Sequence, residues 1–199
     1  MKDTNATVIV DLNQTEEEIL KNLHKDARWG IGRAKKENLN VEISNNKKDW
    51  EEFYEIYKNT ISKGGANIET LEHVKEHGQI FFTCKKNGKL VAGATLEIIK
   101  GQPPRLSRNA SLNEYQKMQP NNLLYWECIK WSKSNGYKRL DLGGYQINPI
   151  GHIKGVNKFK EKWGRIVYYY KDYPIHIAIG RKLFRKSKLA RIIKNKIRG

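Results

Sequence analysis

The sequence predicts a single α/β domain in which a mixed sheet carries helices on both faces. Three observations indicate this fold. Short apolar strands alternate with amphipathic helices, a hairpin signal lies near the middle, and residues 123–170 give a helix, a strand, a second helix and a last strand in succession. With 199 residues, 38% of them hydrophobic, the chain is long enough to bury one core.

The chain is expected to open with a strand and a helix. Residues 6–12 are largely apolar and suit a strand. Thr15 and Glu18 form a capping box, in which each side chain binds a backbone amide at a helix start. Apolar residues spaced by three and four positions extend this helix to about residue 38. Gly30 and Gly32 lie inside this stretch and are the positions where the helix is expected to be interrupted, because glycine has a low helix propensity.

A short strand and two helices are expected next. Residues 40–44 suit the strand. Residues 48–63 place four aromatic side chains along one side of a helix, which the glycine pair 64–65 ends. Residues 68–77 suit a further short helix.

A hairpin is the clearest signal in the middle of the chain. Residues 79–86 and 89–100 suit two strands, and Asn87-Gly88 between them is a pair that favours a two-residue primed turn. The proline pair 103–104 separates this hairpin from a strand at 105–111.

The last part of the domain is expected to be a helix, a strand, a short helix and a strand. Pro120 suits the start of the first helix, because a proline in the first turn loses no needed hydrogen bond, and Gly136 suits its end. The strand 139–142 is expected to break at Gly143 and Gly144.

The net charge of +17 attracts polyanions, so nucleic acid, anionic lipid and nucleotide-linked substrates are candidate partners. A basic surface that serves only solubility is the alternative.

No run reaches the roughly 18 apolar residues that span a bilayer, and the N-terminus lacks a signal-peptide pattern, so a cytoplasmic protein is expected. Cys84 and Cys128 are expected to be reduced, structural thiols.

Residues 174–199 differ in composition from residues 1–173, which are expected to form the domain. The segment holds nine Lys or Arg residues, no acidic residue, and regularly spaced apolar residues. A basic amphipathic helix of this kind suits the anionic inner face of the plasma membrane. A helix docked on the domain by its apolar side is the alternative.

Three motifs resemble segments of the FemABX-type peptidoglycan aminoacyltransferases, which share the GNAT acyltransferase fold. Residues 28–43, RWGIGRAKKENLNVEI, resemble the arginine-rich helix that opens the second domain of these proteins. Residues 122–144 resemble their helix and strand ending in aspartate and glycines. Phe159-Lys160 with Trp163-Gly164 resembles their Phe-Lys-x-x-Phe-Gly segment, with tryptophan in place of the second phenylalanine.

The resemblance covers about residues 8–173 and implies a single domain where the family usually has two. A complete cleft then requires a homodimer, a partner protein or a smaller substrate. It also implies an aminoacyl-tRNA donor, which suits the basic surface. Acetyl-CoA is disfavoured as donor and no other cofactor is expected, because the strand-to-helix junction 111–122 lacks the glycine-rich loop that holds pyrophosphate.

The implied reaction is attack of an amine on an activated acyl ester, which needs positioning and oxyanion stabilisation more than a nucleophilic side chain. The resemblance gives Lys160 the role of contacting a phosphate-bearing acceptor; a solvated lysine is the alternative. Asp141 is expected to orient the amine or accept its proton, or else to cap the turn after its strand.

Further residues are candidates for substrate binding. Gly143 and Gly144 lie at the strand end where α/β sheets bind ligands. Their lack of a side chain either permits a ligand to approach the backbone closely or only allows the chain to turn. Phe159 is a substrate contact or a core residue. Tyr125 belongs to a group of helix aromatics of which one is expected to stack on a base or sugar, and the others to be core.

The remaining candidates are basic side chains that could bind phosphate and two histidines that could bind a metal ion. Arg28 and Arg33, with the lysines that follow them, suit a phosphate-contacting strip or a solvated helix face. His73 and His77 have metal-ligand spacing without a recognisable motif, so no metal site is expected.

The leading hypothesis is therefore an aminoacyltransferase that forms an amide on a peptidoglycan or other lipid- or nucleotide-linked envelope precursor. The alternatives are an acetyl-CoA-dependent N-acetyltransferase of a glycan or capsule pathway, a non-catalytic tRNA-binding module, and a membrane-surface partner of a larger enzyme.

Overall fold

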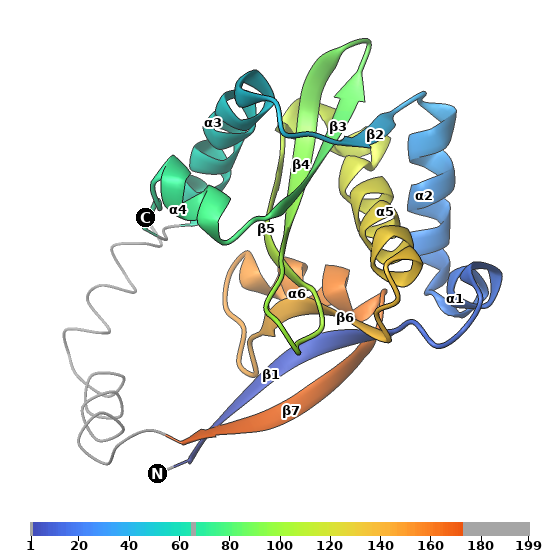
Figure 1. Cartoon of the computed structure of the whole chain (residues 1–199), viewed down its shortest axis with the longest axis vertical. Coiled ribbons are helices and arrows are strands. Elements are labelled where there is room, and N and C mark those ends of the chain that lie inside the picture. The colour runs from blue at the N-terminus through green and yellow to red at the C-terminus, as the bar shows by residue number, and fades with distance from the viewer. Residues whose placement is uncertain (1, 65–66, 173–199) are drawn as a thin grey trace.

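Seven strands form the sheet at the centre of the molecule (Figure 1). The structure, a computed structural model, describes residues 2–64 and 67–172. The strands are β1 (Lys2–Asp11), β2 (Asn40–Ile43), β3 (Ile80–Lys86), β4 (Lys89–Glu97), β5 (Arg105–Ser111), β6 (Arg139–Tyr145) and β7 (Arg165–Asp172). Their order is β2-β3-β4-β5-β6-β1-β7, and all neighbours are antiparallel except β5 and β6. The predicted mixed sheet is confirmed.

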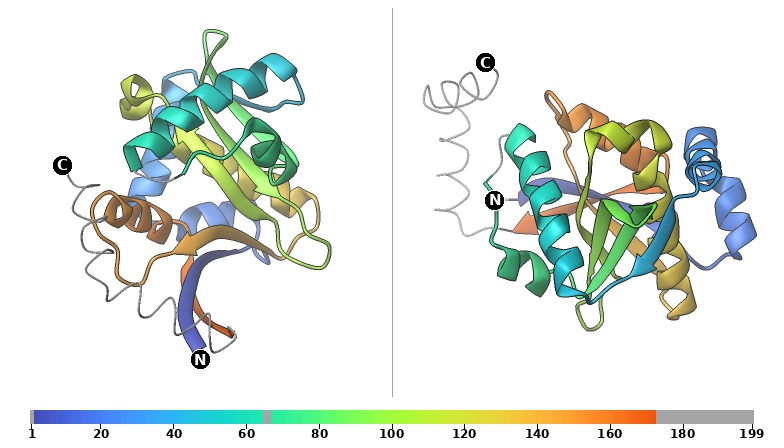
Figure 2. Two further views of the ribbon diagram at one scale, coloured as in Figure 1. Left: turned by 90° about the vertical axis from the view of Figure 1, so that its left-hand side faces the viewer. Right: turned by 90° about the horizontal axis from the view of Figure 1, so that it is seen from above.

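Helices cover both faces of this sheet (Figure 2). They are α1 (Glu16–Asn22), α2 (Lys25–Lys36), α3 (Lys47–Gly64), α4 (Leu71–Glu76), the 3₁₀ helix η1 (Asn113–Met118), α5 (Pro120–Ser134) and α6 (Ile153–Glu161). α3 and α4 lie over one face, and α2 and α5 lie over the other.

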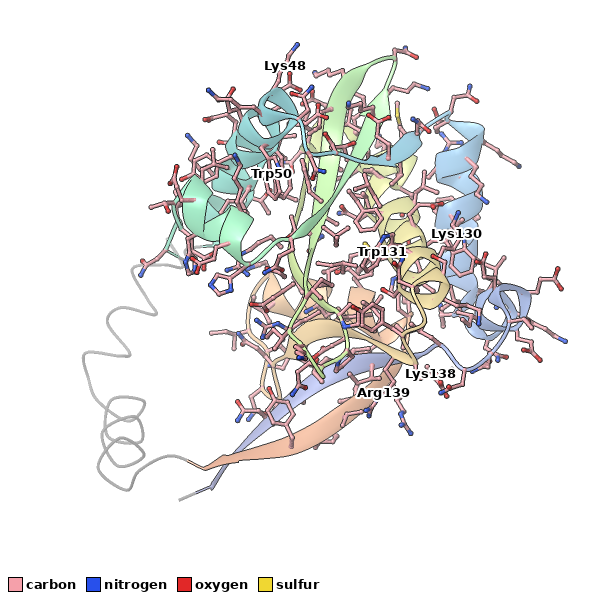
Figure 3. The ribbon with its side chains drawn as sticks, in the orientation of Figure 1. Lys48, Trp50, Lys130, Trp131, Lys138 and Arg139 are labelled. Carbon is pink, nitrogen blue, oxygen red and sulfur yellow. The ribbon has the colours of Figure 1, made fainter. Side chains whose placement is uncertain are left out.

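Two core layers follow from the alternation of side chains along β3. Phe81 packs on Trp50 of α3, with ring centroids 4.2 Å apart. The next residue, Phe82, points to the other face and meets Trp131 of α5 edge-on, with ring centroids 6.4 Å apart. Trp131 and Trp50 are labelled in Figure 3. The smaller core lies under α3 and α4, and the larger one lies under α2, α5 and α6.

The single helix predicted for residues 15–38 is two helices, and the glycines are not the cause. The break falls at Leu23, whose backbone is extended, and at His24, whose N–H donates to the Lys162 carbonyl at 3.1 Å. Gly30 lies within α2, where an added Cβ would be 2.5 Å from the Asn122 side chain of α5. This glycine permits the close crossing of α2 and α5 and leaves the helix intact.

The prediction that Gly143 and Gly144 end their strand is also wrong. Both residues lie inside β6, which continues to Tyr145. Gly143 has a φ of +77°, and the pairing of β6 with β1 shifts register opposite Thr7 and Ile9. The glycine pair therefore forms an irregularity within a continuing strand, because β1 supplies hydrogen-bond partners on both sides of it.

Other local predictions are confirmed. Asn87 and Gly88 have φ values of +49° and +79°, as a type I′ turn requires. Thr15 and Glu18 form the capping box, and Pro120 is the first residue of α5. Gly136, just after that helix, has a φ of +80°.

None of the helices in residues 2–64 and 67–172 is both long and apolar enough to cross a bilayer. The basic segment 174–199 lies outside the described residues. Its helix, its contact with a membrane and the domain boundary at residue 173 stay predictions.

Candidate active site

β5 and β6 are joined at one point and then separate. Their parallel ladder has one pair in register, Arg105 with Asp141, and the Asp141 N–H donates to the Pro104 carbonyl at 2.9 Å. Beyond this pair β5 runs on to Ser111 and β6 to Tyr145 in diverging directions (Figure 1). The carboxyl halves of the two strands therefore separate at the edge where α/β sheets bind ligands.

The side chain of Lys160 on α6 lies where the two strands separate. The residue is 9% exposed, and its Nζ donates to the Gly144 carbonyl at 2.9 Å. A Cβ on Gly143 would lie 3.7 Å from this Nζ and 3.0 Å from the Leu106 carbonyl of β5. One glycine thus lies between the ammonium group and β5. Within residues 2–64 and 67–172, the other two N–H groups of Nζ have no hydrogen-bond acceptor.

Burial determines the charge state of Lys160. It lowers the pKa of the ammonium group from 10.5 to about 8, because desolvation penalises the charged form. The Asp141 carboxylate raises this pKa and opposes part of the effect. At pH 7 the group is still mostly protonated, so a poorly solvated cation with two N–H donors unused by the described residues lies between β6 and β5. Such a group suits a phosphate or a developing oxyanion.

The lowered pKa predicts that stability depends on pH. Between pH 8 and 10.5 the unfolded lysine binds a proton that the folded one has lost, so the free energy of unfolding rises with pH in this window. The total rise is about 3 kcal/mol. Urea unfolding at pH 7 and pH 10 is expected to show this rise in the wild type relative to Lys160→Met. Parallel pH dependence of the two proteins would show that Lys160 has an ordinary pKa.

Asp141 holds the backbone beside Lys160. Its Oδ1 accepts from the Thr7 hydroxyl and from the Gly143 N–H, the latter at 2.7 Å. Thr7 Oγ1 also lies 2.9 Å from the Gly143 carbonyl. These contacts fix the positive φ of Gly143, which is the local capping role that the sequence left as the alternative to catalysis. The catalytic role of Asp141 stays a proposal.

Phe159 and Tyr125 form an aromatic support for α6. Their ring centroids are 4.9 Å apart with an interplanar angle of 86°, and Trp163 lies 5.4 Å from Tyr125. Tyr125 is 1% exposed, so its ring is not accessible to a base or sugar, and its burial places it in the core. Phe159 is partly buried against the same core. Together these rings position the helix turn that carries Lys160.

Arg28 and Arg33 both have partners within the protein. Arg28 Nη1 donates to the Lys21 carbonyl at 2.7 Å and to the Leu23 carbonyl, which caps the end of α1. Arg33 pairs with Glu37 at 2.5 Å on the exposed side of α2. The Arg28 contacts are structural, and substrate binding by either arginine stays a proposal.

A cavity of about 440 Å³ lies along another side of α6. Its walls combine the loop after β6 with the outer side of the helix, and the Tyr145 hydroxyl donates to Glu161 across it at 2.6 Å. Lys160 does not line it. The lining residues are Tyr145, Asn148, Pro149, Ile150, Lys154, Asn157, Lys158 and Glu161.

One group in the described part of the chain brings three metal-ligand atoms within 4.8 Å of one another: His73, Glu76 and His77. Both imidazoles already have carboxylate partners. His77 Nδ1 lies 2.6 Å from Glu97, and His73 Nε2 lies 3.4 Å from Glu69. Each imidazole thus has a carboxylate neighbour within the protein, and the absence of a metal site stays a prediction.

Cys84 and Cys128 are buried and free. Burial raises the pKa of the Cys84 thiol to about 12, and it raises that of Cys128 as well. Both thiols are therefore poor nucleophiles.

Two residues of the site were not predicted from the sequence. Thr7, which binds Asp141, is a polar residue in an apolar strand. Asn157 is 3% exposed and donates to the Gln146 carbonyl at 2.7 Å, which fixes the loop after β6. A buried asparagine three residues before Lys160 has helical spacing with it, and that spacing was the available signal.

Comparison with known proteins identifies the family of this domain. A family model described as "Acetyltransferase (GNAT) domain" matches residues 21–161, which is most of the chain. The chain belongs to the GNAT acetyltransferase domain family. Among curated proteins, the lipid II:glycine glycyltransferase of Staphylococcus haemolyticus (strain JCSC1435) is 28% identical over 109 residues, covering 54% of this chain and 26% of that protein.

Solved structures show the same fold. The crystal structure of FemX superposes with a TM-score of 0.69 at 16% identity, over 90% of this GNAT-family chain and 63% of FemX. L-PGS from Bacillus licheniformis gives a TM-score of 0.60 at 14% identity, over 89% of this chain and 64% of that structure. The predicted resemblance to FemABX-type proteins is confirmed. The chain spans about a quarter of the curated relative and less than two thirds of FemX.

Proposed function

We propose that this GNAT domain transfers an aminoacyl group from aminoacyl-tRNA to an amine of a lipid- or nucleotide-linked cell-envelope precursor, forming an amide. The observation that carries the proposal is the buried Lys160 cation at the parting of β5 and β6. The names of the relatives support the substrate class. One is named for glycyl transfer to lipid II, and a solved domain with a TM-score of 0.62 is assigned to a lysylphosphatidylglycerol synthetase from Agrobacterium fabrum.

The proposed reaction places few chemical demands on the protein. The acceptor nitrogen attacks the ester carbonyl carbon, the ester C–O bond breaks, and the tRNA 3′ oxygen leaves. The nitrogen loses one proton and the leaving oxygen gains one. Lys160 binds the phosphate of the acceptor or the charge on the carbonyl oxygen. Asp141 is proposed to orient the amine through Oδ2, which accepts no hydrogen bond within residues 2–64 and 67–172, whereas Oδ1 accepts from Thr7 and Gly143.

The start of α5 supports aminoacyl-tRNA over acetyl-CoA as donor. Pyrophosphate binding at a helix start requires free backbone N–H groups. Here Pro120 has none, and the N–H groups of Asn122 and Leu123 both point to the Gln119 carbonyl, at 3.1 and 3.5 Å. Acetyl-CoA remains the second candidate donor, because the family model is that of an acetyltransferase.

The proposed setting is the cytoplasm at the inner face of the plasma membrane, where such an acceptor is linked to lipid. The positively charged surface favours both this setting and a tRNA donor. A second copy of the chain or a partner protein is proposed to complete the cleft, since FemX extends beyond the matched region.

The proposal is tested by incubating the full chain with a mixture of charged tRNAs and a lipid-linked peptidoglycan precursor, and following amide formation by mass spectrometry. A precursor heavier by one amino-acid residue is the expected product. A parallel reaction with acetyl-CoA and the same acceptor tests the second candidate. Product from acetyl-CoA alone would overturn the choice of donor, and binding of tRNA without product would indicate a binding module.

A further inference from the structure

One side chain on α2 differs from all others on that helix. Trp29 is 62% exposed, whereas the apolar residues Ala27, Ile31 and Ala34 of the same helix are at most 4% exposed. The proposed function does not use this indole. An exposed indole of this kind can stack on a planar ligand such as a base.

Trp29 lies in the middle of a positively charged stripe. Lys25, Trp29, Gly32 and Lys36 recur at helical spacing, and all are exposed. A Cβ on Gly32 would meet no atom within 4 Å, so the space beside the indole is open. We call these four residues the outer stripe of α2.

Basic residues outnumber acidic residues around the outer stripe. Arg28, Arg33 and Lys35 flank it. The two acidic residues of the region are engaged: Asp26 with Lys162 at 3.2 Å, and Glu37 with Arg33 at 2.5 Å. Cations around an accessible ring match single-stranded nucleic acid, in which phosphates alternate with bases that stack on aromatic side chains.

We propose that the outer stripe of α2 binds single-stranded RNA, with Trp29 stacked on a base and Lys25 and Lys36 on phosphates. This inference rests on the proposed function, because it assigns the surface to the unpaired 3′ end of the tRNA donor. Stacking on an indole tolerates any base, so one site serves many tRNAs.

The position of α2 agrees with this assignment. The His24 N–H donates to the Lys162 carbonyl at 3.1 Å, and Lys162 also pairs with Asp26. The first turn of α2 is thereby fixed to the end of the helix that carries Lys160. RNA bound at the Lys25 end of the outer stripe therefore lies near the C-terminal end of α6, the helix that carries Lys160.

An anionic bilayer fits the outer stripe less well. Helices that lie on membranes bury a continuous apolar face between the headgroups. The apolar residues of α2 face the protein core, and the solvent side has one indole next to a glycine. A single ring is enough to stack on one base and too little to anchor a helix in lipid.

The test measures RNA binding apart from acyl transfer. A fluorescein-labelled single-stranded RNA dodecamer ending in CCA, without an amino acid, is titrated with the full chain and followed by anisotropy. Trp29→Ala is expected to weaken binding about tenfold, and Trp29→Phe to stay close to the wild type. Tyr168→Ala is the matched control, since Tyr168 is 59% exposed on β7 and is expected to have no effect.

The charges are tested by salt dependence. The double variant Lys25→Ala, Lys36→Ala is expected to reduce the slope of log affinity against log salt by about 1.4, because each phosphate contact on a single strand contributes about 0.7. Lys48→Ala on α3, on the other side of the molecule (Figure 3), is the control and is expected to leave the slope unchanged.

Three results would overturn the inference: no RNA binding by the wild type, equal binding by Trp29→Ala, or Trp29-dependent binding to phosphatidylglycerol vesicles without RNA binding. Because the RNA carries no acyl group, failure of the proposed transfer reaction leaves this result intact. If transfer occurs and Trp29→Ala leaves RNA binding and the KM for charged tRNA unchanged, the inference fails and the proposed function stands.

Discussion

Lys160→Met is expected to lower kcat/KM for amide formation by about 10²–10³-fold, which is the usual cost of removing one group that stabilises charge in a transition state. Methionine fills most of the volume of the lysine but carries neither a charge nor a hydrogen-bond donor. The loss is expected to be large because the ammonium group is almost fully buried. In the low dielectric of the protein interior, its attraction to a negative charge on the substrate is stronger than in water. Initial rates of amide formation under the conditions that support product in the wild type provide the measurement.

Lys158→Met is the matched control for this effect. Lys158 is on the same helix but exposed, and it lines the cavity on the other side of α6. It is expected to change kcat/KM less than fivefold. Lys160→Arg is expected to retain measurable activity, since it keeps the charge in a bulkier group. If Lys158→Met and Lys160→Met lose activity equally, the effect belongs to the general positive charge of α6 and not to the buried cation.

Gly164→Ala is expected to be among the most destabilising single substitutions in the chain. An added Cβ would lie 2.3 Å from the carbonyl oxygen of Ile9, 2.8 Å from the carbonyl carbon of the same residue and 3.1 Å from the backbone nitrogen of Val10. These are backbone atoms of β1, which is held by β6 on one side and β7 on the other, so they are unable to move aside. A loss of about 3–5 kcal/mol is expected, and thermal or urea unfolding measures it.

Gly155→Ala is the control for this substitution. Gly155 lies in α6 and is exposed, and its added Cβ meets nothing within 4 Å. Alanine is expected to leave stability unchanged or raise it by up to about 1 kcal/mol, since alanine is the better helix former. A Gly164→Ala protein as stable as the wild type would show that β1 and β7 pair less closely than described.

Local signals in the sequence predicted most elements of the fold. The capping box at Thr15, the primed turn at Asn87 and the proline at the start of α5 each act within a few residues, and each is confirmed. The two errors have tertiary causes. The break at His24 depends on a hydrogen bond to Lys162, far away in the chain, and β6 continues through Gly143 because β1 pairs beside it.

The candidate site was predictable in part. The resemblance around Phe159 and Trp163 selected Lys160, and the structure places it beside Gly143 and Gly144, which the sequence also selected. Its burial and lowered pKa were not predictable, because they depend on how α6 packs against the sheet. The burial of Tyr125 follows from the same packing, which brings three aromatic rings together under α6.

The pH dependence of kcat/KM for amide formation is the decisive test for a catalytic Lys160 cation, because it reports the titration of groups in the free enzyme. If a buried lysine cation holds the anionic reactant, the wild-type profile falls above about pH 8, where Lys160 loses its proton. In Lys160→Arg this falling limb disappears, because a guanidinium stays charged. A wild-type profile that does not fall up to pH 10, or an identical falling limb in Lys160→Arg, would contradict the account.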